Sequence, residues 1–159
     1  MGPTIFTIGH GEQQLDDLFA LLREWEIEVL VDVRSYPSSR RNPQFNKNSL
    51  IGECIRYGIV YNWGVALGGK PRDRRLWFND ETPDYQAMSE TAEFKSAITA
   101  LVEAASEART VIMCSESRPE RCHRALLLQA PLMEEGAVVK HILPNGALLE
   151  EVAASKRLL

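Results

Sequence analysis

The chain has 159 residues, of which 45% are hydrophobic, and a formal net charge of −4 at neutral pH. A chain of this length buries enough surface to fold without disulfides or metal ions, so we expect a single α/β domain over residues 1–159. The net charge disfavours nonspecific nucleic-acid binding by bulk charge. No apolar run approaches the ~20 residues of a membrane span, and the N-terminal residues lack the pattern of a signal peptide. We therefore expect a cytoplasmic protein with no membrane partner.

The first part of the chain alternates short apolar strands with amphipathic helices. Residues 4–8 are β-branched and apolar and predict a buried strand, and the spacing of apolar residues over 12–26 predicts a helix with one apolar stripe. Residues 29–33 are apolar enough for a strand that is covered on both faces. After a polar segment, residues 49–57 predict a short helix and residues 59–61 a third strand.

A long loop then separates these elements from the second half of the chain. Residues 62–83 are rich in Gly, Arg, Asp and Pro, and loops of this length in compact domains are usually functional or disordered. From about Thr91, apolar residues follow the helical period for more than three turns. Residues 110–113 and 137–143 predict two further strands. The tail after Gly146 predicts a short amphipathic helix.

The segment after the fourth predicted strand contains an unusual number of chemically active side chains. Ser117 and Glu120 have the spacing of a capping box, so a helix is predicted to begin at about Pro119. The free N–H groups and the dipole at the start of a helix favour an anion. The side chains placed at this turn are those of Cys114, Glu116, Cys122, His123 and Arg124.

Strands that alternate with helices predict right-handed crossovers and a parallel sheet. We expect a single-domain three-layer α/β sandwich with a mostly parallel, Rossmann/flavodoxin-like sheet of about five strands flanked by helices. Ligands of such folds bind at the carboxyl ends of the strands. His10, Asp32, Arg34, Cys114 and Glu116 follow predicted strands and would share that rim.

Four groups of residues occur together in the order typical of one protein family. They are Thr7-Ile8-Gly9-His10, Asp32-Val33-Arg34 with Pro37, Ser39 and Arg40, Leu67-Gly68-Gly69, and Cys114-Ser115-Glu116 with Pro119 and Cys122-His123-Arg124. With them the chain resembles the domain of unknown function 488 family over about residues 4–143. The resemblance implies a compact α/β fold with these motifs around one pocket, and it implies no established reaction.

The candidate catalytic residues each have a structural alternative. Asp32 or Glu116 is a candidate general base, and the alternative is a buried ion pair with an arginine. His123 is a candidate for proton transfer, and the alternative is a hydrogen bond to a main-chain carbonyl. Cys122 has the electropositive neighbours that favour a thiolate nucleophile, and the alternative is simple packing beneath the helix.

The three cysteines are too few for a disulfide scaffold, and we expect Cys54, Cys114 and Cys122 to be reduced thiols. The position of Cys114 at the end of a predicted strand fits two roles: a small buried hydrophobic residue, or a nucleophile or metal ligand. Structural zinc sites usually use cysteine pairs two to four residues apart, and the chain has none, so we predict no metal site. The sequence indicates no particular cofactor.

Several basic and polar residues are candidates for binding an anion. Arg34, Arg40 and Arg124 form the predicted clamp, because guanidinium groups match phosphate or carboxylate oxygens. His10, Ser39 and Lys70 are expected to join them. The Gly68-Gly69-Lys70 stretch either wraps a phosphate with its amides or forms a plain turn.

Positive charge is concentrated in one part of the chain. Residues 34–75 contain nine Lys or Arg and two Asp or Glu, which gives +7 against −11 for the remainder. Aromatic residues are interleaved with the basic ones as far as residue 78. This alternation of basic and aromatic residues is typical of surfaces on which bases stack while the cations neutralise the phosphate backbone. It is equally typical of a solvated loop whose aromatic rings pack into the core. Residues 34–78 are therefore the candidate nucleic-acid surface.

Three functions of different classes follow from these residues. The leading hypothesis is an enzyme that acts on a phosphorylated or nucleotide-like substrate or on the end of a nucleic acid, so a small anionic ligand is the expected partner. The second is a nucleotide or single-stranded nucleic-acid binding module without chemistry. The third is a thiol-based or metal-based sensor that uses Cys114 and Cys122.

Overall fold

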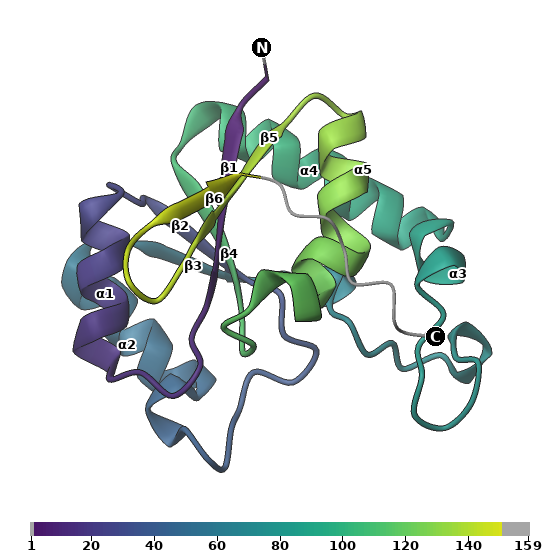
Figure 1. Ribbon diagram of the computed structural model, residues 1–159, viewed down its shortest axis with the longest axis horizontal. Coiled ribbons are helices and arrows are strands. Elements are labelled where there is room, and N and C mark those ends of the chain that lie inside the picture. Colours follow the sequence, from purple (N-terminus) through teal and green to yellow (C-terminus); the bar gives the residue numbers. More distant parts are fainter. Residues whose placement is uncertain (1, 151–159) are drawn as a thin grey trace.

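The computed structural model describes residues 2–150, which form three layers with one sheet between two layers of helices (Figure 1). The strands are β1 (Thr4–Gly9), β2 (Val29–Asp32), β3 (Val60–Trp63), β4 (Thr110–Cys114), β5 (Val138–Ile142) and β6 (Leu148–Glu150). The helices are α1 (Leu15–Glu24), α2 (Lys47–Tyr57), α3 (Tyr85–Ser89), α4 (Ala92–Glu107) and α5 (Gln129–Glu134). The strand order is β3-β2-β4-β1-β5-β6, and only β6 is antiparallel to its neighbour. Within residues 2–150, no helix is long and apolar enough to span a membrane.

The sheet is covered on both faces because successive residues of a strand point to opposite sides. In β1, Ile5 packs into the cluster formed with α4 and α5, whereas Phe6 packs into the cluster formed with α1 and α2. Strand β4 is buried along its whole length and lies between β1 and β2. Its last residue, Cys114, pairs with Gly9, and β2 ends beside Met113. The polar residues that follow these three strands therefore meet at one rim of the sheet.

The local sequence of helix α4 determines both where the helix begins and which of its faces is buried. The hydroxyl of Thr91 accepts a hydrogen bond from the Phe94 amide at 3.2 Å and caps the first turn. Phe94, Ile98 and Leu101 are buried at helical spacing and join the core cluster on this face of the sheet. The capping residue and the apolar stripe agree with each other, and the predicted helix is found over Ala92–Glu107.

The predicted three-layer α/β sandwich with a mostly parallel sheet is confirmed. The sheet has six described strands where about five were expected, because a hairpin adds β6 to β5. The prediction of a helix after Gly146 is wrong for residues 148–150, which form β6, and residues 151–159 lie outside the described part of the chain. The Gly146 amide donates to the Leu143 carbonyl at 2.8 Å and closes the turn that returns the chain antiparallel.

The predicted capping box after β4 is also wrong. Arg118, and not Ser117, precedes the first helical residue, and no side chain caps this turn. Residues Pro119–Arg121 form a 3₁₀ turn, and residues Arg124–Leu128 form a π-helical turn that continues into α5. Cys122 therefore lies at the junction of a tight 3₁₀ turn and a wider π-helical turn, and its carbonyl accepts from the Ala125 amide at 3.0 Å.

The segment predicted as one long irregular loop, residues 62–83, contains short ordered pieces. Strand β3 continues to Trp63, and 3₁₀ turns follow at Val65–Leu67 and Arg74–Leu76. Helix α3 comes next and was missed, although it has a capping signal. The Asp84 carboxylate accepts from the Ala87 amide at 3.1 Å and starts this five-residue helix.

Ile98→Ala is expected to lower the free energy of unfolding by about 2–5 kcal/mol, the usual cost of cutting a buried aliphatic side chain down to alanine. Ile98 is 2% exposed in the cluster beneath α4. The exposed Lys95 on the same helix is the control, because Lys95→Ala should change stability by less than about 0.5 kcal/mol. Urea unfolding followed by circular dichroism measures both, and equal effects would contradict the packing described for α4.

Candidate functional site

A pocket of ≈ 440 Å³ opens at the carboxyl ends of β2 and β4. Its walls come from the segments after these two strands, from the Gly69-Lys70 turn and from the start of α3. The predicted site residues that line it are Arg34, Ser39, Lys70, Cys114, Glu116, Cys122 and His123. Most of the predicted residues are therefore brought together, as the placement at strand ends suggested.

Arg124 is fully buried and faces Cys122 instead of the open pocket. Its Nε donates to the Cys122 Sγ at 3.3 Å, and its main-chain N–H donates to the same sulfur at 3.4 Å. The remaining donors reach the Thr7 hydroxyl at 2.9 Å and the Glu116 carbonyl at 2.5 Å. All of these partners are internal, so the guanidinium of Arg124 stabilises the sulfur and the turn around it.

The imidazole ring of His123 contacts the same sulfur. Its Nδ1 lies 3.6 Å from the Cys122 Sγ, and its Nε2 lies 3.0 Å from the Val33 carbonyl. A carbonyl only accepts hydrogen bonds, so Nε2 is the ring nitrogen that carries the proton. In the neutral ring, Nδ1 then presents a lone pair toward the thiol. A cysteine, a neighbouring base and a group that orients the base form the arrangement of an activated nucleophile.

The environment of Cys122 favours the thiolate. Burial alone would raise its pKa, but the hydrogen bonds from Cys114 and His123 and the charges of His123 and Arg124 lower the pKa well below its ordinary value. The pKa of Cys114 is raised, because the group is buried and hydrogen-bonded to Cys122. The two sulfurs thus differ in character: the surroundings of Cys122 favour its thiolate, whereas those of Cys114 favour its protonated thiol, whose Sγ lies 3.8 Å from the Glu116 carbonyl oxygen.

The glycine pair Gly68-Gly69 lets the long loop approach the site closely. A Cβ on Gly69 would lie 3.0 Å from the His123 ring, and a Cβ on Gly68 would lie 2.4 Å from the Ser35 hydroxyl. That hydroxyl accepts from the Lys70 amide at 2.8 Å. The glycines therefore serve close packing against His123 and Ser35, and this packing places the exposed Lys70 on the pocket wall.

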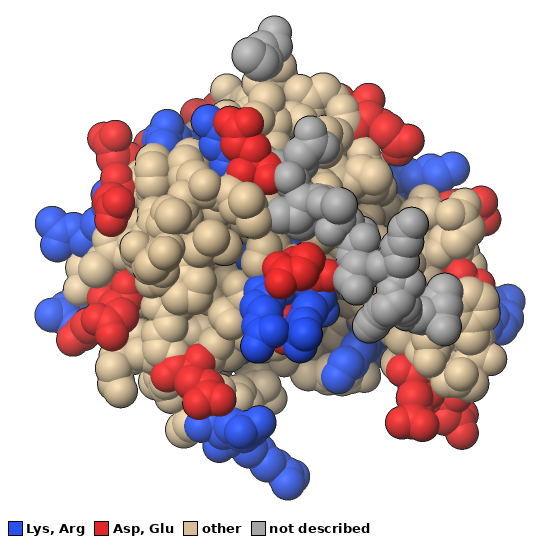
Figure 2. Space-filling model, viewed as in Figure 1, with Lys and Arg blue, Asp and Glu red and all other residues tan. Residues whose placement is uncertain are grey.

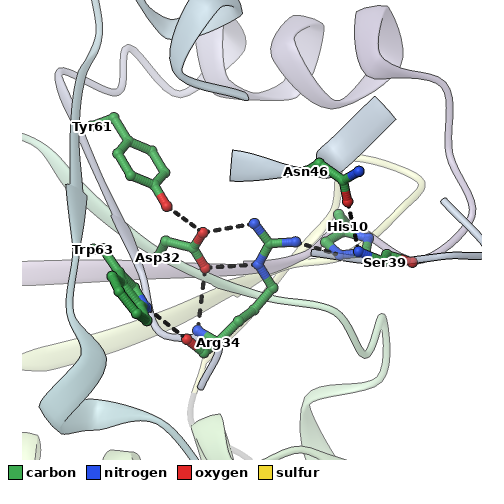
Figure 3. Close-up of polar contacts among 7 residues, drawn as sticks. All are labelled: His10, Asp32, Arg34, Ser39, Asn46, Tyr61 and Trp63. Atoms are coloured by element: carbon green, nitrogen blue, oxygen red, sulfur yellow. Dashed lines mark hydrogen bonds and ion pairs between the residues drawn. The ribbon is translucent and has the colours of Figure 1, made fainter. Parts of the chain in front are cut away.

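Asp32 and Arg34 form a buried, bidentate ion pair (Figure 3). The Arg34 Nε and Nη2 donate to the two carboxylate oxygens at 2.8 and 2.7 Å, and the Tyr61 hydroxyl donates to one of them at 2.6 Å. Burial and this hydrogen bond raise the pKa of Tyr61. These contacts favour the ion-pair interpretation of Asp32 over that of a free base. Arg34 still lines the pocket, but its charge is largely matched inside the protein.

His10 is buried behind Arg34 and stacks on Phe45, with ring centroids 4.3 Å apart. Its Nε2 lies 3.5 Å from the Arg34 Nη1 (Figure 3). Its Nδ1 lies 2.8 Å from the Gly11 carbonyl. Burial is the main cause that lowers the pKa of His10 from 6.5 to about 4. His10 is thus a neutral support of the ion pair, and it does not line the main pocket.

The other predicted residues differ in how far they reach the site. Ser39 lines the pocket, and its hydroxyl accepts from the Asn42 amide at 2.9 Å. The Glu116 carboxylate also lines it and accepts from the Arg118 amide at 3.0 Å. Arg40 is exposed and does not line this pocket. The three-arginine clamp is therefore not assembled in this structure, because Arg40 and Arg124 both face elsewhere.

The sequence prediction missed several residues of the pocket wall, among them Ser35, Tyr85, Ser115 and Arg121. Ser115 directly follows β4 and Ser35 lies three residues beyond the end of β2, so the rule that placed their neighbours could have found them. Tyr85 belongs to the unpredicted α3, and burial raises its pKa to about 12. Figure 2 shows charges of both signs over the viewed face, with a compact group of basic side chains near its centre.

Four of the nine basic residues of the candidate nucleic-acid surface, residues 34–78, stack on aromatic rings of the same segment. Lys47 lies 4.7 Å from the centroid of Trp63, and Arg74 lies 4.7 Å from that of Trp77. The Trp63 Nε1 also donates to the Arg34 carbonyl at 2.9 Å, which holds its ring in place (Figure 3). These rings are engaged internally, in keeping with the structural interpretation of this stretch.

Comparison with known proteins identifies the family. A family model described as "Domain of unknown function DUF488" matches residues 14–130, and the chain belongs to this family. No curated protein and no solved structure shows a significant match. The description of the family names no reaction, so the residues of the pocket carry the functional inference.

Acidification is expected to destabilise the protein between pH 6.5 and about 4. Burial lowers the pKa of both His10 and His141 from 6.5 to about 4, so in this window the unfolded chain binds protons that the folded chain does not. The stability contributed by each neutral histidine is present above pH 6.5 and lost as the pH falls to 4, at most about 3 kcal/mol each. Urea unfolding at several pH values measures this.

The variants His10→Asn and His141→Asn separate the two contributions. Each should be less stable than wild type at pH 7, since the His141 ring bonds the Thr7 hydroxyl at 2.6 Å and His10 stacks on Phe45. Each should also show about half of the wild-type pH slope in this window. An unchanged slope in both variants would show that other groups control the acid sensitivity.

Proposed function

We propose that this member of the DUF488 family is an enzyme that uses the Cys122 thiolate as a nucleophile on a phosphate-containing substrate. One observation carries the proposal: two N–H groups of Arg124 and the Nδ1 of His123 converge on the Cys122 sulfur. Hydrogen bonds from a guanidinium stabilise a thiolate, and an oriented imidazole beside it can move a proton. The sulfur also borders a pocket large enough for a small ligand.

The alternative catalytic assignments have weaker support. Both oxygens of Asp32 accept short hydrogen bonds from buried partners, so a free lone pair for proton abstraction is hard to supply. Glu116 lines the pocket and has one of its oxygens bound to an amide. Glu116 therefore remains a second group for proton transfer, beside the more closely placed His123.

The pocket has cations where an anionic substrate would enter. Lys70 and Arg121 are exposed on its wall, and Ser35 and Ser39 add hydroxyl groups. Neither exposed cation is paired with a carboxylate among the ion pairs of residues 2–150. A phosphate group would satisfy both, whereas Arg34 and Arg124 are already matched internally.

A phosphoryl transfer through Cys122 can be written with balanced atoms. The thiolate attacks phosphorus, the bond to the leaving oxygen breaks, and His123 as imidazolium gives that oxygen its proton. His123, now neutral, takes a proton from a water molecule that attacks the phosphocysteine. Inorganic phosphate leaves, and the thiolate and imidazolium are restored. Arg124 holds the sulfur throughout, as a positioning residue for the thiolate.

A nucleic-acid binding role for residues 34–78 is the second candidate function. It is favoured by two exposed aromatic side chains, Tyr36 and Phe78, which are 55% and 65% exposed. Tyr36 also borders the main pocket and has the Arg72 guanidinium 5.4 Å from its ring centroid. A nucleotide whose base stacks on Tyr36 would have its phosphate in the pocket. Nucleic-acid binding and the enzymatic function are therefore compatible.

Cys122→Ser is expected to reduce phosphate release by at least about a thousandfold, the scale on which loss of a nucleophile acts. Turnover is measured with aryl phosphates, nucleoside phosphates and short 5′-phosphorylated oligonucleotides. Cys54→Ser is the matched control, since Cys54 is a buried thiol on the α2 side of the sheet whose pKa burial raises to about 12. Activity retained in Cys122→Ser, or no turnover of any phosphate by the wild type, would contradict the proposal.

The cations of the pocket wall should attract an anionic reagent to Cys122. We expect iodoacetate to alkylate Cys122 faster, relative to neutral iodoacetamide, in the wild type than in Lys70→Ala or Arg121→Ala. A fall in this ratio of about fivefold corresponds to ~1 kcal/mol of charge interaction. Arg40→Ala is the control, because Arg40 is exposed and outside the pocket. Mass spectrometry of the modified peptide measures the ratio of the two alkylation rates. Equal ratios in the wild type and all three variants would contradict the proposed anion site.

A further inference from the structure

Cys114, Cys122 and His123 lie close enough together to hold one metal ion. Their ligand atoms all lie within 4.8 Å of one another, and all three residues line the pocket. We propose that this triad binds Zn²⁺ through three protein ligands and leaves a fourth coordination position open to the pocket. The inference is independent of whether Cys122 acts as a nucleophile.

The spacing of the triad fits a tetrahedral ion. With Zn–S and Zn–N bonds of about 2.3 and 2.0–2.1 Å, tetrahedral geometry puts sulfur and nitrogen ~3.6 Å apart and two sulfurs ~3.8 Å apart. The distance from the Cys122 Sγ to the His123 Nδ1 is 3.6 Å. The Cys114 sulfur lies within 4.8 Å of both other ligand atoms, so a small rotation of one side chain would complete the site.

The residues around the triad already hold His123 in the orientation that a metal ligand needs. A zinc-bound histidine almost always donates its other ring N–H to a carbonyl or carboxylate, and the Nε2 of His123 does so to the Val33 carbonyl at 3.0 Å. Both cysteines would bind as thiolates, and any thiol proton still present would be released to solvent. The N–H groups of Arg124 can keep their bonds to the Cys122 sulfur, because they approach it from the buried side.

The charges around the pocket determine which ions are accepted. Lys70, Arg121 and the buried Arg124 oppose any cation, so an ion bound mainly through oxygen ligands and charge, such as Mg²⁺ or Ca²⁺, is disfavoured. Two soft thiolates and an imidazole select Zn²⁺. A bound Zn²⁺ would occupy the sulfur lone pair of Cys122. Metal binding and nucleophilic attack therefore exclude each other, and Zn²⁺ would be a reversible inhibitor of the thiolate.

Competition with a chromophoric chelator tests the site in the full chain under a non-thiol reductant. We expect one Zn²⁺ per chain and no competition by Mg²⁺ at equal concentration. Cys114→Ser, Cys122→Ser and His123→Asn should each weaken Zn²⁺ binding by more than about 100-fold, since even outer-shell partners of a metal are worth 10–100-fold. Co²⁺ should give a thiolate-to-metal charge-transfer absorption that Cys122→Ser loses.

Two controls test whether Zn²⁺ binding depends on the triad and whether the variants stay folded. Cys54→Ser removes a buried thiol outside the triad and should leave the affinity unchanged. His123 is only partly buried, so His123→Asn should keep the fold, and circular dichroism of the metal-free variants verifies this. Absence of stoichiometric binding, or binding that survives all three triad substitutions, would overturn the inference.

A separate readout distinguishes this inference from the proposed catalysis. Bound Zn²⁺ should slow alkylation of Cys122 by iodoacetamide by at least tenfold, and a chelator should restore the rate. If Zn²⁺ binds and protects Cys122 while Cys122→Ser keeps full turnover, the metal site stands and the nucleophile fails. If turnover requires Cys122 and no Zn²⁺ binds, the opposite holds.

Discussion

The buried guanidinium of Arg124 is the constraint on which the site depends. A guanidinium is always charged in proteins, and a buried charge is costly unless a counter-charge and hydrogen bonds compensate it. Arg124 donates to the Cys122 sulfur, the Thr7 hydroxyl and the Glu116 carbonyl, and it also interacts with the neighbouring Cys114 thiol. Of these groups only the two thiols can become anions, and Cys122 is the one whose pKa is lowered. The stability of the buried arginine and the ionisation of Cys122 are therefore linked, and loss of either should weaken the other.

The second buried arginine shows the contrast. Arg34 has Asp32 as a bidentate partner, and Tyr61 adds a further donor to the same carboxylate (Figure 3). Two neighbouring strands thus each present a buried arginine at the rim, one matched by a carboxylate and one by a thiolate. The carboxylate pair is chemically inert and fixes the segment after β2. The thiolate pair leaves a soft, reactive atom at the pocket wall, so the chemistry is concentrated after β4.

The parts that could be predicted from the sequence are those with a local pattern. Helix α4 has its cap and its stripe within one segment, and the rule that ligands bind at strand ends placed Arg34, Cys114 and Glu116 around one pocket. The direction in which Arg124 points could not be predicted, because it depends on Thr7, more than a hundred residues away in the chain. The 3₁₀ and π-helical turns around Cys122 and the hairpin that adds β6 were missed because turn geometry outweighed local helix propensity.

A thiolate stabilised this strongly has a chemical consequence of its own. The hydrogen bonds that lower the pKa of a thiol also lower the intrinsic nucleophilicity of its sulfur, so stabilisation alone does not make Cys122 fast. What remains is a sulfur whose pKa is lowered, held in one orientation and placed beside the imidazole of His123. Such a sulfur reacts fastest with an anionic electrophile. The cations of the pocket wall attract that electrophile and so offset the low intrinsic nucleophilicity of the sulfur. The same fixed sulfur is also a good metal ligand, and this is why a nucleophile and a zinc site can share one residue.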